Sequence, residues 1–400
     1  MNYLLIKIHW KIMRNSVYWM KASLFYLQFV LKYQLVLLFF SYHWGKRMKR
    51  TDKLLSGLPE KTGVLIHNPS NIFYLSGYTG EGLLLLAPGV NAVITDFRYV
   101  EAAQKQCPGF AVHAIRSGVS HAAVAHELLE NAGIRDLAIE DNIITVRGMR
   151  EIEKVMPGIR FSPLDFKVEK LREVKDDDEL SCIEHACDIT CQAFEYICGF
   201  IAPGRTEREV QLALDYKMLQ LGADGLAFNT IVASGENGSL PHAVPSDREI
   251  EEGDMVTIDF GARKDGYDAD MTRTVAVGQP SDKMRKIYDI VLRAQETAQA
   301  AIAPGVPTAQ IDKIARDIIT EAGYGECFGH STGHGVGIDI HEEPRVSSRS
   351  DQILTPGNIV TVEPGIYVPG LRGVRIENTC AVTETGVRAL CGASKELRIL

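Results

Sequence analysis

Acidic side chains lie in pairs on strand-like segments in the second half of this 400-residue chain. Residues 253–262 and 267–277 are predicted to be strands, because a Lys-Asp-Gly turn signal at 264–266 separates them. A turn centred between the first two residues of that signal places Asp259 directly opposite Asp270. Opposed residues on neighbouring strands have Cβ atoms about 4.5–5.5 Å apart, and like charges there are destabilising. Two opposed carboxylates therefore require something that offsets their mutual repulsion.

A second hairpin repeats this arrangement. Residues 359–368 and 373–382 are predicted strands on either side of Pro-Gly-Leu at 369–371. A turn centred on the glycine of that signal places Glu363 opposite Glu377. Four carboxylates on otherwise apolar strands must be solvated at sheet edges, paired with cations such as Arg273 and Arg375, or neutralised in another way.

Two divalent cations would neutralise four carboxylates completely. An oxygen-rich site without thiolates favours Mn²⁺, Co²⁺ or Fe²⁺ over structural Zn²⁺. Two such ions about 3.5–4 Å apart can share a hydroxide and polarise a carbonyl, which is the chemistry of hydrolysis. The residue types therefore favour a two-metal hydrolase.

Histidines supply nitrogen donors in the same region. His334 has glycine on both sides, so the backbone can approach closely, and His242, His330 and His341 lie in the same half of the chain. We expect the four to share one site. The sequence has no G-x-S-x-G and no H-E-x-x-H motif, so neither a serine hydrolase nor a zincin is supported.

An internal repeat indicates how these residues could be brought together. Residues 253–261 match residues 357–365 at an offset of 104, with four identical positions and Asp259 corresponding to Glu363. Ala-Pro-Gly and His-x-x-Pro sequences also occur once in each half. A duplicated α+β unit folded about a pseudo-twofold axis would bring the two carboxylate strands side by side.

The first part of the chain has a different pattern. Short apolar runs alternate with helical periodicity, which predicts an α/β layered domain over residues 48–165. A charged stretch at 166–178 is the expected linker, and 179–400 is the expected catalytic domain. The predicted strands are 63–67, 83–87, 92–95 and 137–140, and the predicted helices are 99–107, 121–133 and a long one that ends near residue 200.

The composition limits the partners. Nine of the 43 basic residues and none of the 51 acidic ones lie in residues 1–50, so the rest of the chain carries a formal charge of −17. This charge argues against nucleic acid as a partner. Eight cysteines without a C-x-x-C pair indicate reduced thiols and a cytoplasmic setting.

Residues 1–47 form a basic and apolar extension. Its stretch 24–42 is about long enough to span a bilayer, which leaves a membrane anchor open. The alternative that we favour is an over-extended start, because Met48 is followed at once by ordinary globular sequence.

Residues of about 176–400 resemble the creatinase/prolidase/methionine aminopeptidase family of "pita-bread" metallopeptidases, and residues of about 52–165 resemble the creatinase-type N-terminal domain. The resemblance implies an α+β fold, with a duplicated pita-bread catalytic domain after a smaller α/β domain. It lies in six motifs: Asp259-Phe260-Gly261, Asp268-Ala269-Asp270-Met271-Thr272-Arg273-Thr274, Gly333-His334-Gly335-Val336-Gly337, His341-Glu342-Glu343-Pro344-Arg345, Val362-Glu363-Pro364-Gly365 and Arg375-Ile376-Glu377-Asn378.

The resemblance also implies residue roles. Asp259 would chelate one metal, His334 and Glu363 the other, and Asp270 and Glu377 would bridge the two. Glu363 would be the general base. The remaining implied roles belong to His242 and His341, which would hydrogen-bond the substrate or the intermediate, His330 near the substrate, Arg345 on a substrate carboxylate, and Arg375, which would brace Glu377 or the N-terminal domain.

The implied reaction removes an N-terminal residue that precedes proline. A prolidase-type Xaa-Pro dipeptidase is slightly favoured by Arg345, and aminopeptidase P, which acts on longer peptides, stays open. A catalytically inactive peptide-binding relative is expected to lose metal ligands, and here all five are present. The implied cofactor is a pair of divalent ions, most readily Mn²⁺, with Co²⁺, Fe²⁺ or Zn²⁺ as alternatives. A homodimer or tetramer is expected.

Overall fold

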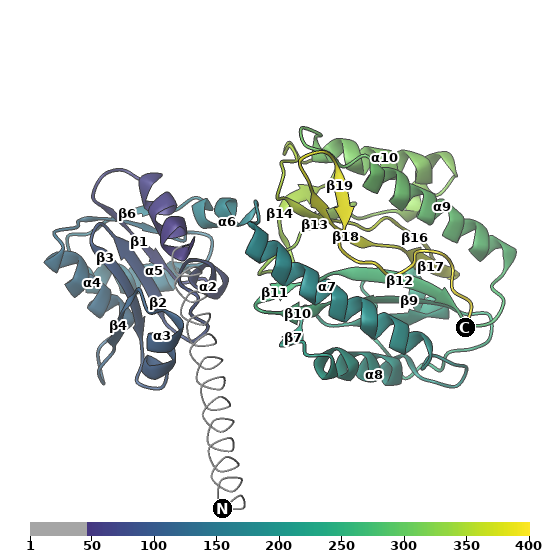
Figure 1. Ribbon diagram of the computed structural model, residues 1–400, viewed down its shortest axis with the longest axis horizontal. Coiled ribbons are helices and arrows are strands. Elements are labelled where there is room, and N and C mark those ends of the chain that lie inside the picture. Colours follow the sequence, from purple (N-terminus) through teal and green to yellow (C-terminus); the bar gives the residue numbers. More distant parts are fainter. Residues whose placement is uncertain (1–45) are drawn as a thin grey trace, which may run out of the picture. The chain divides into compact units, whose positions relative to one another are not determined.

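The computed structural model describes residues 46–400, which divide into one compact unit that ends at Phe166 and a second from Lys167 to Leu400 (Figure 1). Almost all of the extension 1–47, with its apolar stretch 24–42, lies outside the described residues. Among the residues from 46 onwards, no helix has the length and apolar character needed to cross a membrane.

The first unit contains a six-stranded mixed sheet with the order β4-β3-β2-β1-β5-β6. Leu65, Leu85 and Ile94 on this sheet pack with Leu129 and Leu137 in its core. The strands and helices predicted from apolar periodicity are confirmed here. The elements are β1 (Thr62–Ile66), α2 (Pro69–Ser76), β2 (Leu83–Ala87), β3 (Val90–Thr95), α3 (Val100–Gln106), β4 (Ala111–Ala114), α4 (His121–Asn131), β5 (Asp136–Ile139), α5 (Val146–Val155) and β6 (Arg160–Pro163).

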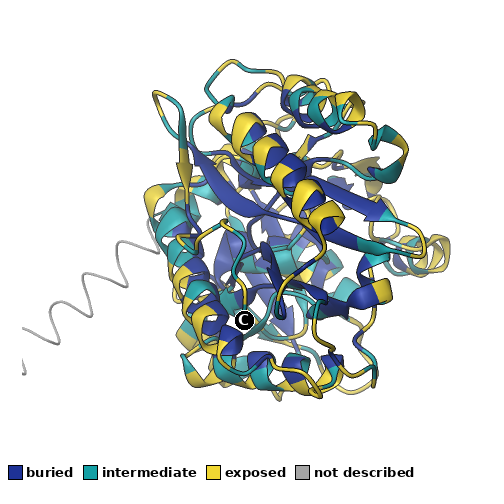
Figure 2. Ribbon diagram, turned by 90° about the vertical axis from the view of Figure 1, so that its right-hand side faces the viewer, coloured by how far each residue is buried: buried dark blue, intermediate teal, exposed yellow. Residues whose placement is uncertain are grey.

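The second unit carries its helices on the outside of buried strands (Figure 2). Capping boxes start two of these helices, since Asp176 accepts from the backbone of Glu179, and Thr206 from that of Glu209. The expected linker 166–178 contains a short helix of its own. The helices are α6 (Lys167–Arg172), α7 (Asp177–Cys198), α8 (Glu207–Gln220), α9 (Asp282–Ala300) and α10 (Thr308–Glu321).

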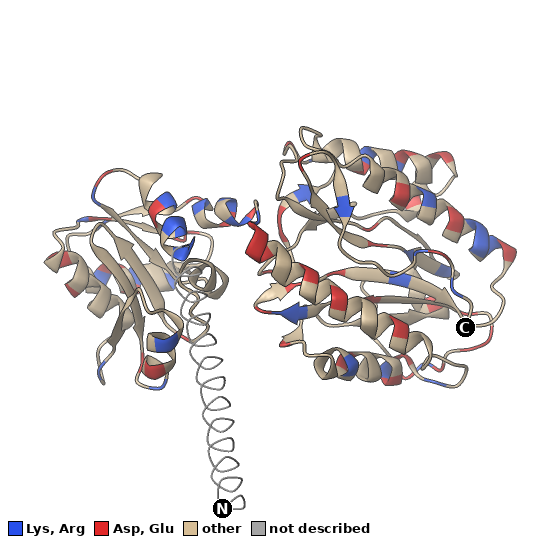
Figure 3. Cartoon of the chain, in the orientation of Figure 1, with Lys and Arg blue, Asp and Glu red and all other residues tan. Residues whose placement is uncertain are grey.

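The strands of the second unit form several small sheets. Charged residues lie mainly on the helices and in the connecting segments and are fewer on the strands (Figure 3), so acidic residues on strands stand out. The sheet orders are β11-β10-β7, β12-β9-β8, β14-β13-β15-β18-β19 and β16-β17. The strands are β7 (Gly225–Leu226), β8 (Ile231–Ser234), β9 (Met255–Phe260), β10 (Ala262–Lys264), β11 (Tyr267–Asp268), β12 (Met271–Ala276), β13 (Gly333–Gly335), β14 (Glu342–Val346), β15 (Ile359–Val362), β16 (Gly365–Val368), β17 (Arg372–Arg375), β18 (Asn378–Val382) and β19 (Val387–Ala389).

The internal repeat is visible in equivalent hydrogen bonds. The amide of Gly204 donates to Ile250 O at 2.9 Å, and the amide of Gly305 donates to Leu354 O at 2.8 Å. Each half has two helices and then a strand beside an acidic residue: α7, α8 and β9, which carries Asp259, in the first half, and α9, α10 and β15, which Glu363 directly follows, in the second. The predicted duplication of an α+β unit is therefore confirmed.

The predicted register of the first hairpin is wrong. Asp259 pairs with Thr272 rather than with Asp270, a shift of two residues. The turn lies one residue further along the chain than expected, because Asp265 and Gly266, which both adopt positive φ (53° and 80°), form the two-residue loop.

The predicted register of the second hairpin agrees with the ladders that flank its acidic residues. Gly365 pairs with Arg375, and Val362 pairs with Asn378. Glu363 and Glu377 lie between these two paired segments.

Candidate metal and active site

A cavity of about 660 Å³ in the second unit collects every site residue that the sequence analysis singled out. Its lining includes four acidic residues, four histidines and three arginines, which come from both halves of the duplicated unit. These residues are Asp259, Asp270, Glu363, Glu377, His242, His330, His334, His341, Arg345 and Arg375, together with Arg208, which the sequence analysis did not single out. The cavity therefore combines oxygen and nitrogen donors with three cations.

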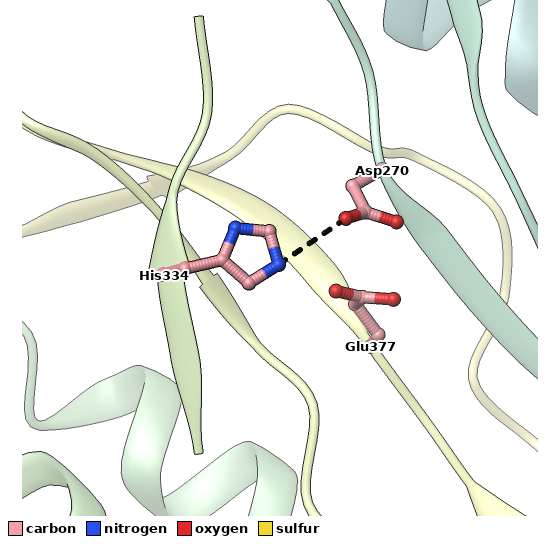
Figure 4. Close-up of side chains that lie close together, drawn as sticks. All are labelled: Asp270, His334 and Glu377. Atoms are coloured by element: carbon pink, nitrogen blue, oxygen red, sulfur yellow. Dashed lines mark ion pairs between the residues drawn. The ribbon is translucent and has the colours of Figure 1, made fainter. Parts of the chain in front are cut away.

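The donors come from neighbouring strands. Asp259 lies on β9, Asp270 directly precedes β12, and His334 lies on β13, whereas Glu363 and Glu377 occupy the gaps after β15 and before β18. Figure 4 shows His334 directed from its strand towards Asp270 and Glu377. One ligand atom from each of these three residues lies within 4.8 Å of the others. Such spacing is suited to a shared cation.

His334 is oriented to accept a cation. Its Nδ1 lies 3.0 Å from Gly335 O, and its Nε2 lies 3.5 Å from Asp270 Oδ2 and 3.4 Å from Glu363 Oε1. Burial lowers the pKa of His334 to about 4, which keeps the ring neutral at pH 7. A proton on Nδ1 donated to the carbonyl leaves the lone pair of Nε2 facing the carboxylates.

The acidic residues are poorly compensated by the protein itself. Burial and the neighbouring carboxylates raise the pKa values of Asp270 and Glu377 well above their ordinary range. Burial raises the pKa of Glu363 to about 7, against the opposing effect of Arg375. Asp259 Oδ1 and Glu377 Oε1 are buried without a hydrogen-bond partner among the described residues. These orphaned oxygens and the repelling charges fit divalent cations.

Apart from His334, Arg375 is the one cationic residue among residues 46–400 that forms an ion pair with these four acidic residues. Its Nη2 lies 2.6 Å from Asp259 Oδ2, its Nε donates to Thr272 Oγ1 at 3.1 Å, and its Nη1 donates to Pro241 O at 3.2 Å. The resemblance implied that Arg375 braces Glu377 or the N-terminal domain. In the structure Arg375 pairs directly with Asp259, and it is linked to Glu377 through Thr272, whose Oγ1 donates to Glu377 Oε2 at 2.7 Å.

Tyr367 is a site residue that the sequence analysis missed. Its hydroxyl lies 2.8 Å from Arg375 Nη1 and 2.9 Å from His330 Nε2. Burial raises the pKa of Tyr367 to about 12, so it stays protonated. The hairpin register offered a signal, because Tyr367 pairs with Gly373, two residues from Arg375 and therefore on the same face.

His341, His242 and Arg345 line the more open part of the cavity. The His341 ring lies edge-on to that of His334, with centroids 4.4 Å apart. Partial burial and the nearby Arg345 lower the pKa of His341. The Arg345 side chain is 64% exposed and its Nε lies 3.6 Å from Glu343 Oε1, so the guanidinium is accessible to a ligand.

Comparison with known proteins identifies the families of the two units. Residues 181–384 match the model of "Metallopeptidase family M24", and residues 49–174 match that of the "Creatinase/Prolidase N-terminal domain". The chain belongs to metallopeptidase family M24. It is a metallopeptidase with a creatinase-type N-terminal domain and an M24 catalytic domain.

Relatives of this M24 peptidase include one sequence and two solved structures that are named as Xaa-Pro peptidases. The Xaa-Pro dipeptidase of Pyrococcus furiosus is 38% identical over 356 residues, which cover 87% of this chain and 99% of that protein. The Xaa-Pro dipeptidase structure from Bacillus anthracis is 42% identical with a TM-score of 0.85, and covers 88% of this chain and 100% of that one. The X-Pro aminopeptidase structure from Thermotoga maritima is 36% identical with a TM-score of 0.82, at the same coverage.

Proposed function

We propose that this M24 metallopeptidase is an Xaa-Pro dipeptidase that hydrolyses the bond between an N-terminal residue and a following proline. The observation that carries the proposal is that one cavity collects the five side chains proposed as metal ligands and an accessible arginine. The dipeptidase names of the Pyrococcus furiosus and Bacillus anthracis relatives support the same substrate class.

The proposed metal ligands are the four acidic residues and one histidine. Asp259 would hold one ion, His334 and Glu363 the other, and Asp270 and Glu377 both. Two bound divalent cations would supply a water of lowered pKa and would polarise the scissile carbonyl. The hard, oxygen-rich donor set supports Mn²⁺ as the preferred ion, with Co²⁺, Fe²⁺ or Zn²⁺ as alternatives.

The protein's own groups would orient the substrate and move the proton. Glu363 would accept the proton of the attacking water at its carboxylate, since its raised pKa lies near neutral pH. His242 and His341 would hydrogen-bond the carbonyl oxygen as negative charge develops on it. His330 would be fixed at the substrate through Tyr367 and Arg375.

Arg345 would select dipeptides. Its exposed guanidinium matches the free carboxylate of an Xaa-Pro dipeptide, and arginine binds carboxylates in bidentate fashion. Proline has no N–H at the scissile amide, so contacts of the cavity with its ring would replace that missing contact.

An aminopeptidase P that acts on longer Xaa-Pro peptides is the second candidate. The X-Pro aminopeptidase structure from Thermotoga maritima supports it. The two relatives that are named Xaa-Pro dipeptidases are more similar to this chain in sequence, at 38% and 42% identity, than the aminopeptidase structure at 36%. Arg345 also offers a carboxylate contact that longer substrates do not need.

The proposal extends to the setting of the enzyme. The eight free cysteines support a reducing, cytoplasmic location. We also expect a homodimer or tetramer, and no nucleic-acid partner, because the chain beyond residue 50 is strongly acidic.

A comparison of peptide lengths tests the proposal. The purified full chain, stripped with chelator and reloaded with Mn²⁺, is assayed on an Xaa-Pro dipeptide and on the Xaa-Pro-Yaa tripeptide with the same first residue. We expect kcat/KM to favour the dipeptide by at least about tenfold, the effect of one lost charged contact. A tripeptide preference would replace the proposal with aminopeptidase P, and inactivity on both with metal bound would reject the peptidase.

A further inference from the structure

The segment that carries His341 is a short connection between two strands of the site. β13 ends at Gly335 and β14 begins at Glu342, so His341 is the last residue of the connection. His341 itself is exposed, and its ring contacts that of His334 edge-on. Its place over the cavity must therefore be fixed by its neighbours in the chain rather than by packing around the ring.

Glu342, the next residue, is anchored by two buried cations. Its side chain is 6% exposed, and those of Arg172 and Lys175 are 4% and 1% exposed. Arg172 Nη2 forms an ion pair with Glu342 Oε1, Arg172 Nε lies 3.2 Å from the same oxygen, and Lys175 Nζ lies 3.0 Å from Oε2. Both carboxylate oxygens are thus engaged, and the pairs lower the pKa of Glu342 against the effect of burial.

The same contacts reach further along the connection. Arg172 Nη2 lies 2.6 Å from Asp339 Oδ2, and the amide of Asp339 donates to Glu342 Oε1 at 3.0 Å. The Glu342 carboxylate also covers the backbone of Gly337, where an added Cβ would lie 2.5 Å from Oε2. The cations therefore hold the carboxylates of Asp339 and Glu342 directly, and the Glu342 carboxylate in turn contacts the backbone of Asp339 and Gly337.

The two cations are themselves fixed to the catalytic strands. The amide of Lys175 donates to Gly357 O at 2.8 Å, and Asn358 Nδ2 donates to Glu173 O at 3.0 Å. Gly357 and Asn358 directly precede β15, the strand that leads to Glu363. The end of α6 and the residues after it thus connect the Glu363 strand to the His341 connection.

We propose that Arg172 and Lys175 are positioning residues that hold His341 over the reacting bond through the Glu342 carboxylate. They do not touch the cavity, since neither lines it. The role as positioning residues for catalysis rests on the proposed peptidase function, whereas the mechanical hold on residues 336–341 does not.

The competing explanation is general stability. A buried ion pair that loses one partner leaves an uncompensated charge, so almost any such variant weakens the fold. A positioning role predicts something more specific, namely that the loss of activity in these variants depends on the presence of the His341 side chain. A double-mutant cycle separates the two, since independent effects multiply in kcat/KM and effects through a common residue do not.

The experiment uses the full chain, loaded with Mn²⁺, as Arg172→Met, Lys175→Met, His341→Ala and the two double variants with His341→Ala. Arg172→Lys is the conservative rescue. Arg398→Met is the control for loss of an ion pair elsewhere in the unit, because Arg398 pairs with Glu195 on α7, at a more exposed position, and does not line the cavity. Assays on an Xaa-Pro dipeptide are combined with metal content and amide hydrogen exchange of residues 336–341.

We expect Arg172→Met to lower kcat/KM roughly 10- to 100-fold at unchanged metal content, as for other groups that orient a site residue. In the His341→Ala background the same change should cost less than about threefold. Exchange at residues 336–341 should accelerate in Arg172→Met and stay unchanged in Arg398→Met. Arg172→Lys should recover most of the activity.

Multiplicative losses in the cycle, or unchanged exchange at residues 336–341, would overturn the inference. If Arg172→Met does not fold, Lys175→Met carries the same cycle, because it removes only one contact to Glu342. If the wild-type chain hydrolyses no Xaa-Pro peptide, the proposed function fails and the catalytic role falls with it, while the exchange measurement still decides the mechanical hold.

Discussion

Arg375 Nη2 and Asp259 Oδ2 lie 2.6 Å apart inside a cluster of four carboxylates. Arg375 offsets one of the four negative charges, and Asp259 Oδ1 stays without a hydrogen-bond partner. When all groups are ionised, Arg375, Asp259, Asp270, Glu363 and Glu377 together carry a formal charge of −3. The site is therefore built to receive further positive charge, and the following predictions test that conclusion and the roles around it.

The first prediction concerns pH and the metal-free chain. Burial raises the pKa of Glu363 from 4.5 to about 7 in the folded state. The folded chain then binds a proton that the unfolded chain has already lost, so stability from this group is full below about 4.5 and is lost as pH rises through about 7. The loss is on the order of 3 kcal/mol.

Denaturant unfolding in chelator at pH 5, 6, 7 and 8 measures this loss, with Glu363→Gln as the comparison. Relative to wild type, Glu363→Gln should gain stability steadily as pH rises. A difference between the two chains that does not change with pH would contradict the raised pKa.

The second prediction concerns a proposed bridging ligand. Asp270→Asn keeps the shape of the side chain and removes one of the mutually repelling charges, so the metal-free chain should keep its fold. Metal content should fall and hydrolysis should drop by more than about 100-fold, because a direct ligand matters at least as much as an outer-shell group. Asp317→Asn, at an exposed ion pair with Lys313, is the control. Wild-type metal content in Asp270→Asn would rule out its role as a ligand.

The third prediction concerns Tyr367. Tyr367→Phe removes the hydroxyl between His330 and Arg375, so kcat/KM should fall roughly tenfold, equal to the loss of about 1.4 kcal/mol. Tyr288→Phe is the matched control, since the buried Tyr288 hydroxyl donates at 2.7 Å to the backbone oxygen of Lys395, which does not line the cavity, whereas the partners of Tyr367 do. Both variants should lose similar stability. Equal activity losses in the two would mean that Tyr367 serves the fold alone.

The fourth prediction concerns Arg345 and the substrate carboxylate. Arg345→Met should raise KM for an Xaa-Pro dipeptide roughly 10- to 100-fold, the value of one charged hydrogen-bonded contact. The same substrate with an amidated C-terminus should be hydrolysed equally by both proteins. Arg349→Met, an exposed arginine in the same segment that does not line the cavity, should match wild type. An equal effect on the amidated substrate would show that Arg345 does not recognise the carboxylate.

The sequence predicted which residues line the cavity better than it predicted how those residues are arranged within it. Apolar periodicity and the repeat were sufficient for the duplication and for many of the elements, because both depend on local patterns, whereas α2, β4, α5 and β6 were not predicted. The register of the first hairpin was missed by two residues, since the backbone of Asp265 and Gly266 decides the turn and several turns fit the same letters. The offset of Asp259 from Asp270 follows from that turn.

The network around Arg375 could not be predicted in the same way. Its partners Asp259 and Thr272 lie 116 and 103 residues away in the chain, and the choice between them and Glu377 depends on tertiary packing. The anchoring of Glu342 by Arg172 spans 170 residues. Charged residues at such separations carry no periodic signal, so only the folded structure identifies their partners.

Metal removal and return tests the central claim most directly. The full chain is stripped with chelator, assayed on an Xaa-Pro dipeptide, and titrated with Mn²⁺ while activity and bound metal are measured together. Four carboxylates and His334 around one cavity predict no activity in the stripped chain and full recovery as two ions bind per chain. Full activity in the metal-free chain, or recovery without bound Mn²⁺, would contradict the account.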